Sequence, residues 1–178
     1  LETLLVDGDP LGGGLDASLG SGEVPGARWP DLAEVRGALN PVQLISALPQ
    51  VSGFALLAGG SADSAAGDGE DGPGYPGRQS PAEAPAEESI RAVMEAARAA
   101  FAFTIVDCER HSPGQLLLSC DALLVVVPGR LRPVLAARML SRSLGSAVPK
   151  AAVVRGPLGD GLDDARAADA AGLPLAGY

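Results

Sequence analysis

LLVDGDPLGGGLD (residues 4–16) is the stretch that decides the fold. An uninterrupted apolar run closed by turn-forming residues is typical of a buried strand, so residues 4–6 are predicted to end one. Asp7 and Asp9 follow directly, on either side of a glycine. Pro10 comes next, followed by one leucine and three consecutive glycines. Glycine adopts backbone conformations that other residues avoid. The stretch therefore predicts a strand that ends in two carboxylates and opens into a loop able to move.

The composition narrows the class of protein. The chain has 178 residues, 47% of them hydrophobic and 20% charged, which predicts a globular protein with a sizeable core. Its net charge of −9 argues against a nucleic-acid-binding surface, which needs clustered lysines and arginines. Cys108 and Cys120 lack the CxxC spacing of a zinc site and fit the reducing cytoplasm. No apolar run is long enough to span a bilayer. Because the first residue is Leu1 rather than methionine, we expect a fragment of a longer protein.

Strands and helices are predicted to alternate along the rest of the chain. The predicted strands cover residues 54–58, 103–106, 122–127 and 151–154, and the predicted helices cover parts of 32–48 and residues 87–101, 133–144 and 163–171. This alternation is typical of βαβ units, so we expect an α/β fold with three layers, in which helices cover both faces of a mostly parallel sheet. Residues 59–86 are rich in Gly, Pro, Ser, Ala and acidic residues without periodicity. They predict a disordered acidic insertion within one domain that spans residues 1–178.

Charged side chains gather where the predicted strands end. Asp7, Asp9, Asp107 and Arg155 all follow a strand, and the carboxyl ends of parallel strands form the functional edge of such a sheet. Mg²⁺ is a hard cation that takes one or two carboxylates and keeps several waters, so converging aspartates suit it. An aspartate at a strand end also commonly caps the next turn or helix. A single aspartate at a strand end would be interpreted as structural, whereas three of them favour a functional site.

Two further classes of phosphate chemistry use aspartates in this position. A phosphatase of the haloacid-dehalogenase type would employ Asp7 as nucleophile and Asp9 as acid and base, with Lys150 as the cation and residues 159–164 at the metal. Against it, Pro10 and a leucine follow the second aspartate, where that class carries Thr or Val. A response-regulator receiver is excluded because Lys150 precedes its predicted strand instead of closing it.

The ordered series of motifs resembles one family. The opening stretch is followed by WPDL (29–32), FTIVDCE (103–109), SCDALLVVVPGRLRPVLAARML (119–140), VVRGP (153–157) and AAGLPLAG (170–177). In this order the segments resemble the MinD/ParA group of deviant-Walker P-loop ATPases. More narrowly, the chain resembles the CpaE-like, septum-site-determining proteins of high-GC bacteria. The resemblance covers about residues 4–177 and is interrupted mainly by the acidic insertion.

The resemblance implies a role for each residue of the site. Asp9 would be the catalytic residue that orients the hydrolytic water, and Asp7 and Asp107 would hold Mg²⁺. Arg155 and Pro157 would contact the nucleotide base. Gly12 would lie in the cofactor-binding loop, and Asp16 would be a further acid of that loop. The implied cofactors are ATP and Mg²⁺. The implied protein is a cytoplasmic ATPase that forms a homodimer on binding ATP, with peripheral association at the inner face of the membrane as an option. Its role would be to position or regulate cell-division or secretion and pilus machinery.

One motif of the family is absent from the sequence. The phosphate-binding loop, GGxGxGK[ST] or similar, should precede the Asp7 strand, and no such sequence occurs in these residues. Without that loop, its strand and its helix, apolar surface of the sheet should remain uncovered. We therefore expect this chain alone to be inactive and its parent to be the ATPase. The alternative is a non-hydrolysing regulator or scaffold with the same fold.

Overall fold

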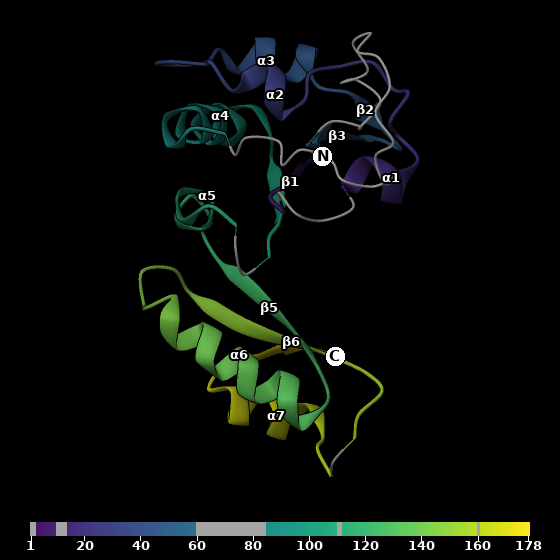
Figure 1. Cartoon of the computed structure of the whole chain (residues 1–178), viewed down its shortest axis with the longest axis vertical. Coiled ribbons are helices and arrows are strands. Elements are labelled where there is room, and N and C mark those ends of the chain that lie inside the picture. The colour runs from purple at the N-terminus through teal and green to yellow at the C-terminus, as the bar shows by residue number, and fades with distance from the viewer. Residues whose placement is uncertain (1–2, 10–13, 60–84, 110–111, 160) are drawn as a thin grey trace, which may run out of the picture. The chain divides into compact units, whose positions relative to one another are not determined.

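The computed structural model describes residues 3–9, 14–59, 85–109, 112–159 and 161–178 (Figure 1). Nearly all of the predicted acidic insertion at residues 59–86 lies outside these ranges, as does Gly12. The chain divides into two compact units, Leu1–Ser119 and Cys120–Tyr178, each with its own sheet and core. The single-domain organisation over residues 1–178 stays a prediction. None of the described helices is both long and apolar enough to cross a bilayer.

The first unit is built on a four-stranded sheet. Its elements are β1 (Thr3–Asp7), α1 (Leu15–Leu19), α2 (Trp29–Leu32), α3 (Pro41–Ala47), β2 (Gln50–Val51), β3 (Phe54–Leu57), α4 (Glu87–Ala100), β4 (Phe103–Asp107) and α5 (Gly114–Leu118). The strand order is β2-β3-β1-β4, with β1 parallel to both β3 and β4 and only β2 antiparallel. Because β1 lies between two parallel neighbours, its carboxyl end is at the middle of the functional edge.

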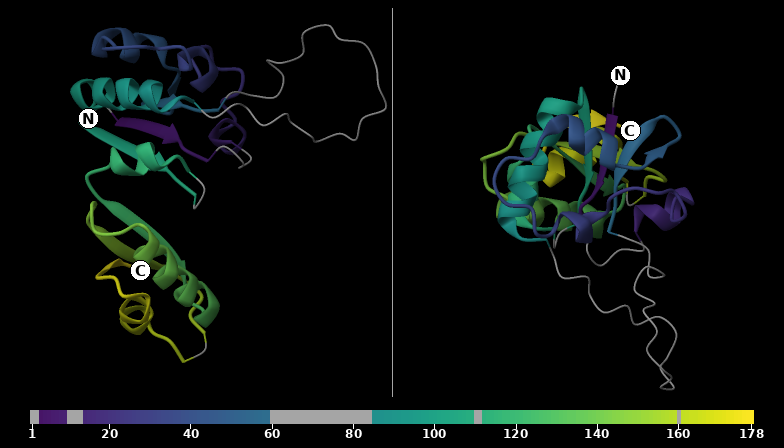
Figure 2. Two further views of the ribbon diagram at one scale, coloured as in Figure 1. Left: turned by 60° about the vertical axis from the view of Figure 1, so that its left-hand side comes forward. Right: turned by 90° about the horizontal axis from the view of Figure 1, so that it is seen from above.

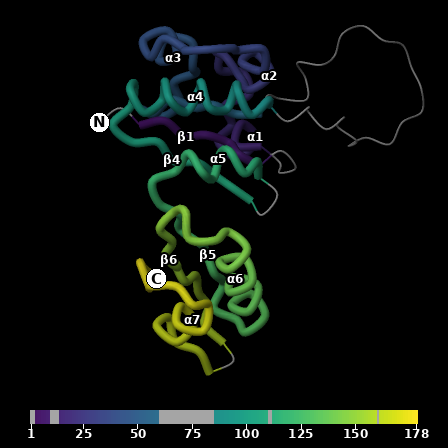
Figure 3. The backbone as a smooth tube through the Cα atoms, turned by 90° about the vertical axis from the view of Figure 1, so that its left-hand side faces the viewer, coloured from purple at the N-terminus to yellow at the C-terminus, as the bar shows by residue number. Residues whose placement is uncertain are grey.

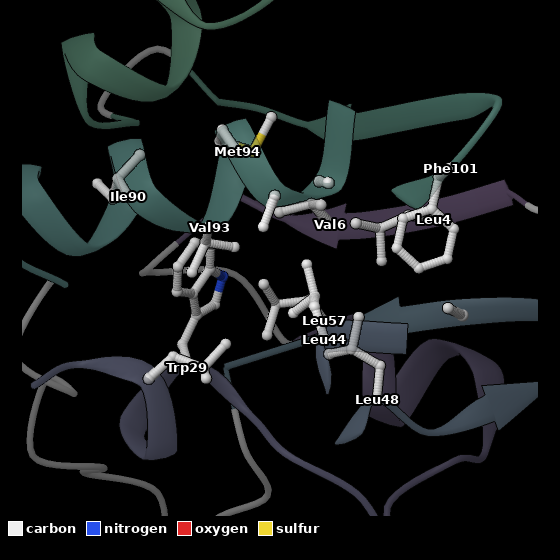
Figure 4. Packing of buried hydrophobic residues seen from close by; sticks show 14 of the residues in the cluster. Leu4, Val6, Trp29, Leu44, Leu48, Leu57, Ile90, Val93, Met94 and Phe101 are labelled. Atoms are coloured by element: carbon white, nitrogen blue, oxygen red, sulfur yellow. The ribbon is translucent and has the colours of Figure 1, made fainter. Parts of the chain in front are cut away.

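The two faces of this sheet pack against different helices. Leu4 and Val6 of β1 are fully buried against α4 and the residues of α2 and α3, including Trp29 (Figure 4). Successive side chains of a strand point to opposite faces, so Leu5 points the other way, to a smaller cluster around Leu56 against which Leu15 of α1 also packs. The first unit therefore has helices on both sides of its sheet, as Figures 2 and 3 show.

The second unit is a three-stranded parallel sheet with two helices. Its elements are β5 (Leu123–Pro128), α6 (Leu131–Ser143), β6 (Lys150–Arg155), α7 (Asp164–Ala171) and β7 (Leu175–Gly177), with the strands in that order across the sheet. Both helices cover the same face, where Val127 and Val154 are buried against Val134 of α6 and Ala168 of α7. Small alanines let α6 and α7 approach each other and the sheet closely.

Apolar side chains remain uncovered on β4 and β5. On β4, Phe103 is 66% exposed and Ile105 is 51% exposed; on β5, Leu124 is 63% exposed and Val126 is 60% exposed. The exposed residues of each strand alternate with less exposed ones, so they share one face of the strand. On β4 and on β5 alike, this face of the sheet is exposed. This agrees with the expectation that apolar sheet surface is left uncovered.

The α/β class with mostly parallel strands is confirmed. Asn40 and Pro41 start α3, because the Asn40 side chain accepts hydrogen bonds from the backbone N–H groups of Val42 and Gln43, at 2.9 and 3.4 Å. Two expectations differ from the structure. The strands form two hydrogen-bonded sheets within the described residues. The predicted helix near residue 32 ends at Leu32, and Gly37 at φ +71° interrupts any continuation toward α3.

Candidate functional site

The strand register brings two of the predicted carboxylates to one edge of the first sheet. Asp7 closes β1 and is paired with Asp107, the last residue of β4. Paired residues of adjacent parallel strands point to the same face, so both side chains lie on the face that carries the exposed Ile105. Asp9 follows two residues after Asp7 and is half-buried. The structure therefore brings Asp7, Asp9 and Asp107 together at the carboxyl edge, as predicted.

Asp7 organises the loop that begins at this edge. Its side chain is 6% exposed, and its two carboxylate oxygens accept hydrogen bonds from backbone N–H groups, from Asp9 at 3.2 Å and from Leu15 at 2.9 Å. Leu15 is the first residue of α1, whose N-terminus favours a negative charge. The carboxylate of Asp7 thus joins the end of β1 to the start of α1, as a capping residue does. This contact favours a loop-fixing role over the predicted role as a magnesium ligand.

Gly8 follows Asp7, the last paired residue of β1, and lies in close contact with the end of β4. A Cβ at this position would lie 2.5 Å from Cδ2 of Leu116 and 2.8 Å from the carbonyl oxygen of Asp107. The Gly8 N–H donates to that same carbonyl at 2.8 Å. Only a residue without a side chain fits, so the glycine between the two aspartates is required by the close approach of the chains.

Ser112 fixes Gly8 from the other side, and sequence reasoning missed it. The buried hydroxyl of Ser112 donates to the carbonyl of Gly8 at 2.5 Å and accepts from the N–H of Glu109 at 2.8 Å. It therefore links the chain after β4 to the chain after β1. No motif marks this serine, because its two partners are backbone groups that lie in different segments.

The carboxylates at this edge fit a hydrated magnesium ion better than a fully protein-ligated metal. Among the described residues, no group of three or more His, Cys, Asp or Glu side chains could hold a metal ion by itself. Mg²⁺ needs no such group, since it is bound by one or two carboxylates, waters and phosphates. Asp107 is exposed at the strand end, and Oε1 of Glu109 is buried without a hydrogen-bond partner among the described residues. An unpartnered carboxylate oxygen two residues beyond Asp107 can accept a hydrogen bond from a metal-bound water.

Asp16 is held in a buried ion pair. Nε and Nη2 of Arg28 donate to its two carboxylate oxygens at 3.0 and 3.2 Å, and Ser21 Oγ donates to Oδ1 at 2.9 Å. The Arg28 guanidinium also donates to three carbonyls, those of Ser21, Val24 and Gly26. All these contacts fix residues 16–28 to one another, so Asp16 is committed to structure rather than to a ligand.

Trp29 joins the end of β1 to the core. Trp29 is 7% exposed and its ring points into the hydrophobic cluster (Figure 4), so it is a core residue. Its indole N–H donates to the backbone carbonyl of Asp7 at 2.8 Å, and its backbone N–H donates to Ala58 just beyond β3 at 3.0 Å. This polar role of the tryptophan was not predicted from the sequence.

The other predicted residues lie in the second unit. Arg155 closes β6 and is exposed, and Pro157 follows it after Gly156 and is exposed too. Both residues lie at the carboxyl end of β6, and their contact with a nucleotide base stays a prediction. Lys150 lies at the opposite end of the same strand, where its ammonium group donates to the carbonyls of Gly145 and Val148. A lysine engaged in this way gives no support to the phosphatase alternative.

The acidic stretch proposed as the metal site of that phosphatase also has a structural role. Asp163 caps α7 by accepting a hydrogen bond from the backbone N–H of Arg166 at 2.7 Å. Asp164 accepts one from the N–H of Ala165 at 2.9 Å. Both carboxylates therefore satisfy the N-terminal end of α7.

Comparison with other sequences finds uncharacterized relatives. The chain is 33% identical over 178 residues to the uncharacterized proteins Rv3660c and MT3760 of two Mycobacterium tuberculosis strains, H37Rv and CDC 1551 / Oshkosh. The alignment covers 98% of this chain and 45% of each relative, so the chain spans about half the length of the curated relatives it matches. No family model matches the sequence.

Comparison with solved structures decides the fold. A ParA family ATPase from Chlorobium tepidum matches with a TM-score of 0.73 over 99% of this chain and 70% of its own, at 16% identity. The chain has the ParA/MinD fold. The septum site-determining protein MinD from Pyrococcus horikoshii, solved as its Mg-ADP complex, matches with a TM-score of 0.68 over 98% of this chain and 66% of its own, at 16% identity. MinD from Aquifex aeolicus gives 0.64 over the same shares, at 17% identity. At such identities the ParA/MinD likeness concerns the fold, and the chemistry must be argued from this chain's own residues.

Proposed function

We propose that this chain is the greater part of a MinD/ParA-like ATPase domain that binds ATP with Mg²⁺ and dimerises when it does so. The observation that carries the proposal is the carboxylate edge of β1 and β4 in a ParA/MinD fold, where Asp7 is paired with Asp107 and accepts a hydrogen bond from the N–H of Asp9. The Mg-ADP complex of the Pyrococcus horikoshii MinD supports nucleotide and magnesium as the ligands to test. The CpaE-like role, positioning or regulating division or secretion and pilus machinery, rests on the motif resemblance.

The three aspartates are assigned different tasks within this proposal. Asp9 orients the attacking water, since it is half-buried and sits on the loop that Asp7 fixes. Asp107 takes the metal through water, because its carboxylate is exposed at the strand end. Bound Mg²⁺ would neutralise charge on the phosphates. Asp7 holds Asp9 and the start of α1 through its carboxylate, and Arg155 and Pro157 are assigned to the nucleotide base.

The phosphate cradle is proposed to come from the longer protein. The one lysine of the chain, Lys150, donates to two backbone carbonyls at the amino end of β6 and is not available for a phosphate-binding loop. The curated relatives are about twice as long as the region they share with this chain. A Walker-type loop elsewhere in the full-length protein would complete the site.

The central experiment measures ATP hydrolysis by the full-length protein and its Asp9→Ala variant. Loss of a group that positions the attacking water should lower turnover by about 100-fold or more, while the affinity for ATP, measured by calorimetry, changes little. Asp169→Asn serves as the control, since it removes an exposed carboxylate from α7. Undiminished turnover in Asp9→Ala would overturn the role given to Asp9.

Dimerisation needs a separate measurement. Light scattering on the slowly hydrolysing Asp9→Ala variant should show a doubled mass with ATP and the monomer mass with ADP. A mass that is the same with both nucleotides would contradict the ATP-dependent dimer.

The second candidate is a non-hydrolysing regulator or scaffold of the same fold. It is favoured by the absence of a lysine-bearing glycine loop from these 178 residues and by the buried, bonded state of Asp7 and Asp16. This candidate predicts that the full-length protein releases no phosphate from ATP even at saturating Mg²⁺. Turnover that is lost in Asp9→Ala would exclude it.

A further inference from the structure

Two consecutive residues hold the two ends of the segment that carries Asp9. The indole N–H of Trp29 donates to the carbonyl of Asp7, where the segment leaves β1, at 2.8 Å. The Arg28 guanidinium binds the carboxylate of Asp16, where the segment enters α1, at 3.0 and 3.2 Å. We propose that Arg28 and Trp29, here termed the brace, are positioning residues that hold Asp7 and Asp16, the two ends of this segment, and through Asp7 hold Asp9 in place for the reaction; this inference rests on the proposed ATPase function.

A continuous set of hydrogen bonds runs from the brace to Asp9. Trp29 fixes the carbonyl of Asp7, and the carboxylate of the same Asp7 accepts the N–H of Asp9 at 3.2 Å. The second oxygen of that carboxylate accepts the N–H of Leu15 at 2.9 Å, next to the residue that Arg28 holds. Both ends of the segment are therefore joined to each other as well as to the brace.

The brace is itself anchored to the rest of the first unit. The backbone N–H of Trp29 donates to Ala58 at 3.0 Å, at the end of β3, and the ring is buried in the main hydrophobic cluster. The N–H of Ala27 donates to the carbonyl of Ala47 at 2.8 Å, and the N–H of Arg28 donates to the carboxylate of Asp31 at 2.8 Å. Asp7 and Asp16 are thus held by residues that are themselves anchored to α2, α3 and the end of β3.

The guanidinium of Arg28 has a geometry that lysine cannot reproduce. It binds both oxygens of Asp16 and at the same time the carbonyls of Ser21, Val24 and Gly26. A planar fork with five donors can serve such a set, whereas an ammonium group is a single point with three donors. Arg28→Lys therefore keeps the charge opposite Asp16 but loosens the position of the segment.

The test uses Arg28→Lys and Trp29→Phe in the full-length protein, with two measurements on each. Trp29→Phe retains an aromatic ring in the core but removes the donor to Asp7, so it remains informative if the arginine variant folds poorly. Amide hydrogen exchange at Leu15 should become at least about tenfold faster in both variants, because that N–H is bonded only while the segment is held. Single-turnover hydrolysis of bound ATP should slow by about 10- to 100-fold, as expected for a displaced catalytic group, while the Kd for ATP stays within about threefold.

The control is Arg91→Gln, which removes an arginine from an exposed ion pair with Glu95 on α4 and should leave both measurements unchanged. Unchanged exchange at Leu15 in both brace variants would overturn the proposal. Faster exchange with unaltered single-turnover rates in a working ATPase would also overturn it, since the segment would then be held for stability alone. If the wild type neither binds nor hydrolyses ATP, the proposed function fails, and the exchange data still decide whether the brace holds the segment.

Discussion

Replacing Gly8 by alanine should drive apart the two strand ends that carry the aspartates. The added Cβ would lie 2.5 Å from Cδ2 of Leu116 and 2.8 Å from the carbonyl oxygen of Asp107. Ordinary contact begins near 3.4 Å, so the carbonyl must retreat by about 0.6 Å, the difference between 3.4 and 2.8 Å. The leucine can rotate away, but the carbonyl belongs to β4 and moves only with its strand.

Overpacking of this kind costs about 1–3 kcal/mol of unfolding free energy. Urea denaturation followed by circular dichroism measures it directly, because the midpoint shifts while the slope stays constant. Gly114→Ala is the matched control: Gly114 begins helix α5, and among the described residues no atom beyond its chain neighbours and its own helix backbone lies within 4 Å of the added Cβ. That control should be neutral or more stable by up to about 1 kcal/mol.

Gly8→Ala should also reduce ATP turnover of the full-length protein, since Asp7 and Asp9 flank the displaced residue. A Gly8→Ala protein that is as stable as Gly114→Ala would refute the close approach of β1 and β4 at this point. Equal turnover by the two variants would refute the link between that approach and the site.

Three further substitutions test neighbouring contacts by the same denaturation assay. Ser112→Ala removes the partner of the Gly8 carbonyl and of the Glu109 N–H, and should cost about 1–3 kcal/mol; an unchanged midpoint would rule out the link. Arg28→Ala leaves the buried Asp16 without its partner and should cost about 3–5 kcal/mol, whereas replacing both residues by apolar ones should cost much less. A loss in the double variant equal to the sum of the losses of the two single variants would show that the pair does not interact. Asn40→Ala should cost about 1 kcal/mol through loss of the α3 cap, with Asn40→Asp close to wild type.

The carboxylate edge could be predicted from the sequence because it depends on local patterns. An apolar run followed by aspartate fixes where a strand ends, and parallel pairing then brings Asp7 beside Asp107 without any further information. A helix start such as Asn40 followed by Pro41 can be recognised for the same reason, since capping involves only neighbouring residues. Short helices such as α1 and α5, of five residues each, span little more than one turn and carry no readable period.

The contacts that hold the site could not be predicted because they join distant segments. Ser112 binds the carbonyl of Gly8, 104 residues earlier, and Trp29 binds the carbonyl of Asp7, 22 residues earlier. In both cases the acceptor is a backbone group, which every residue has, so side-chain identity at that position carries no signal. Asp16 appears as one more acid of the loop until its partner Arg28 is located in space.

Trp29 is the one tryptophan among these 178 residues, and its indole nitrogen touches the strand end where the aspartates begin. A buried indole with a fixed donor bond emits at shorter wavelength than one in water, so the chain carries its own optical probe at this edge. Detachment of the bond to Asp7 would change the emission before the ring leaves the core. Motion at the β1 end and collapse of the whole unit could therefore be followed separately, in one cuvette and without a label.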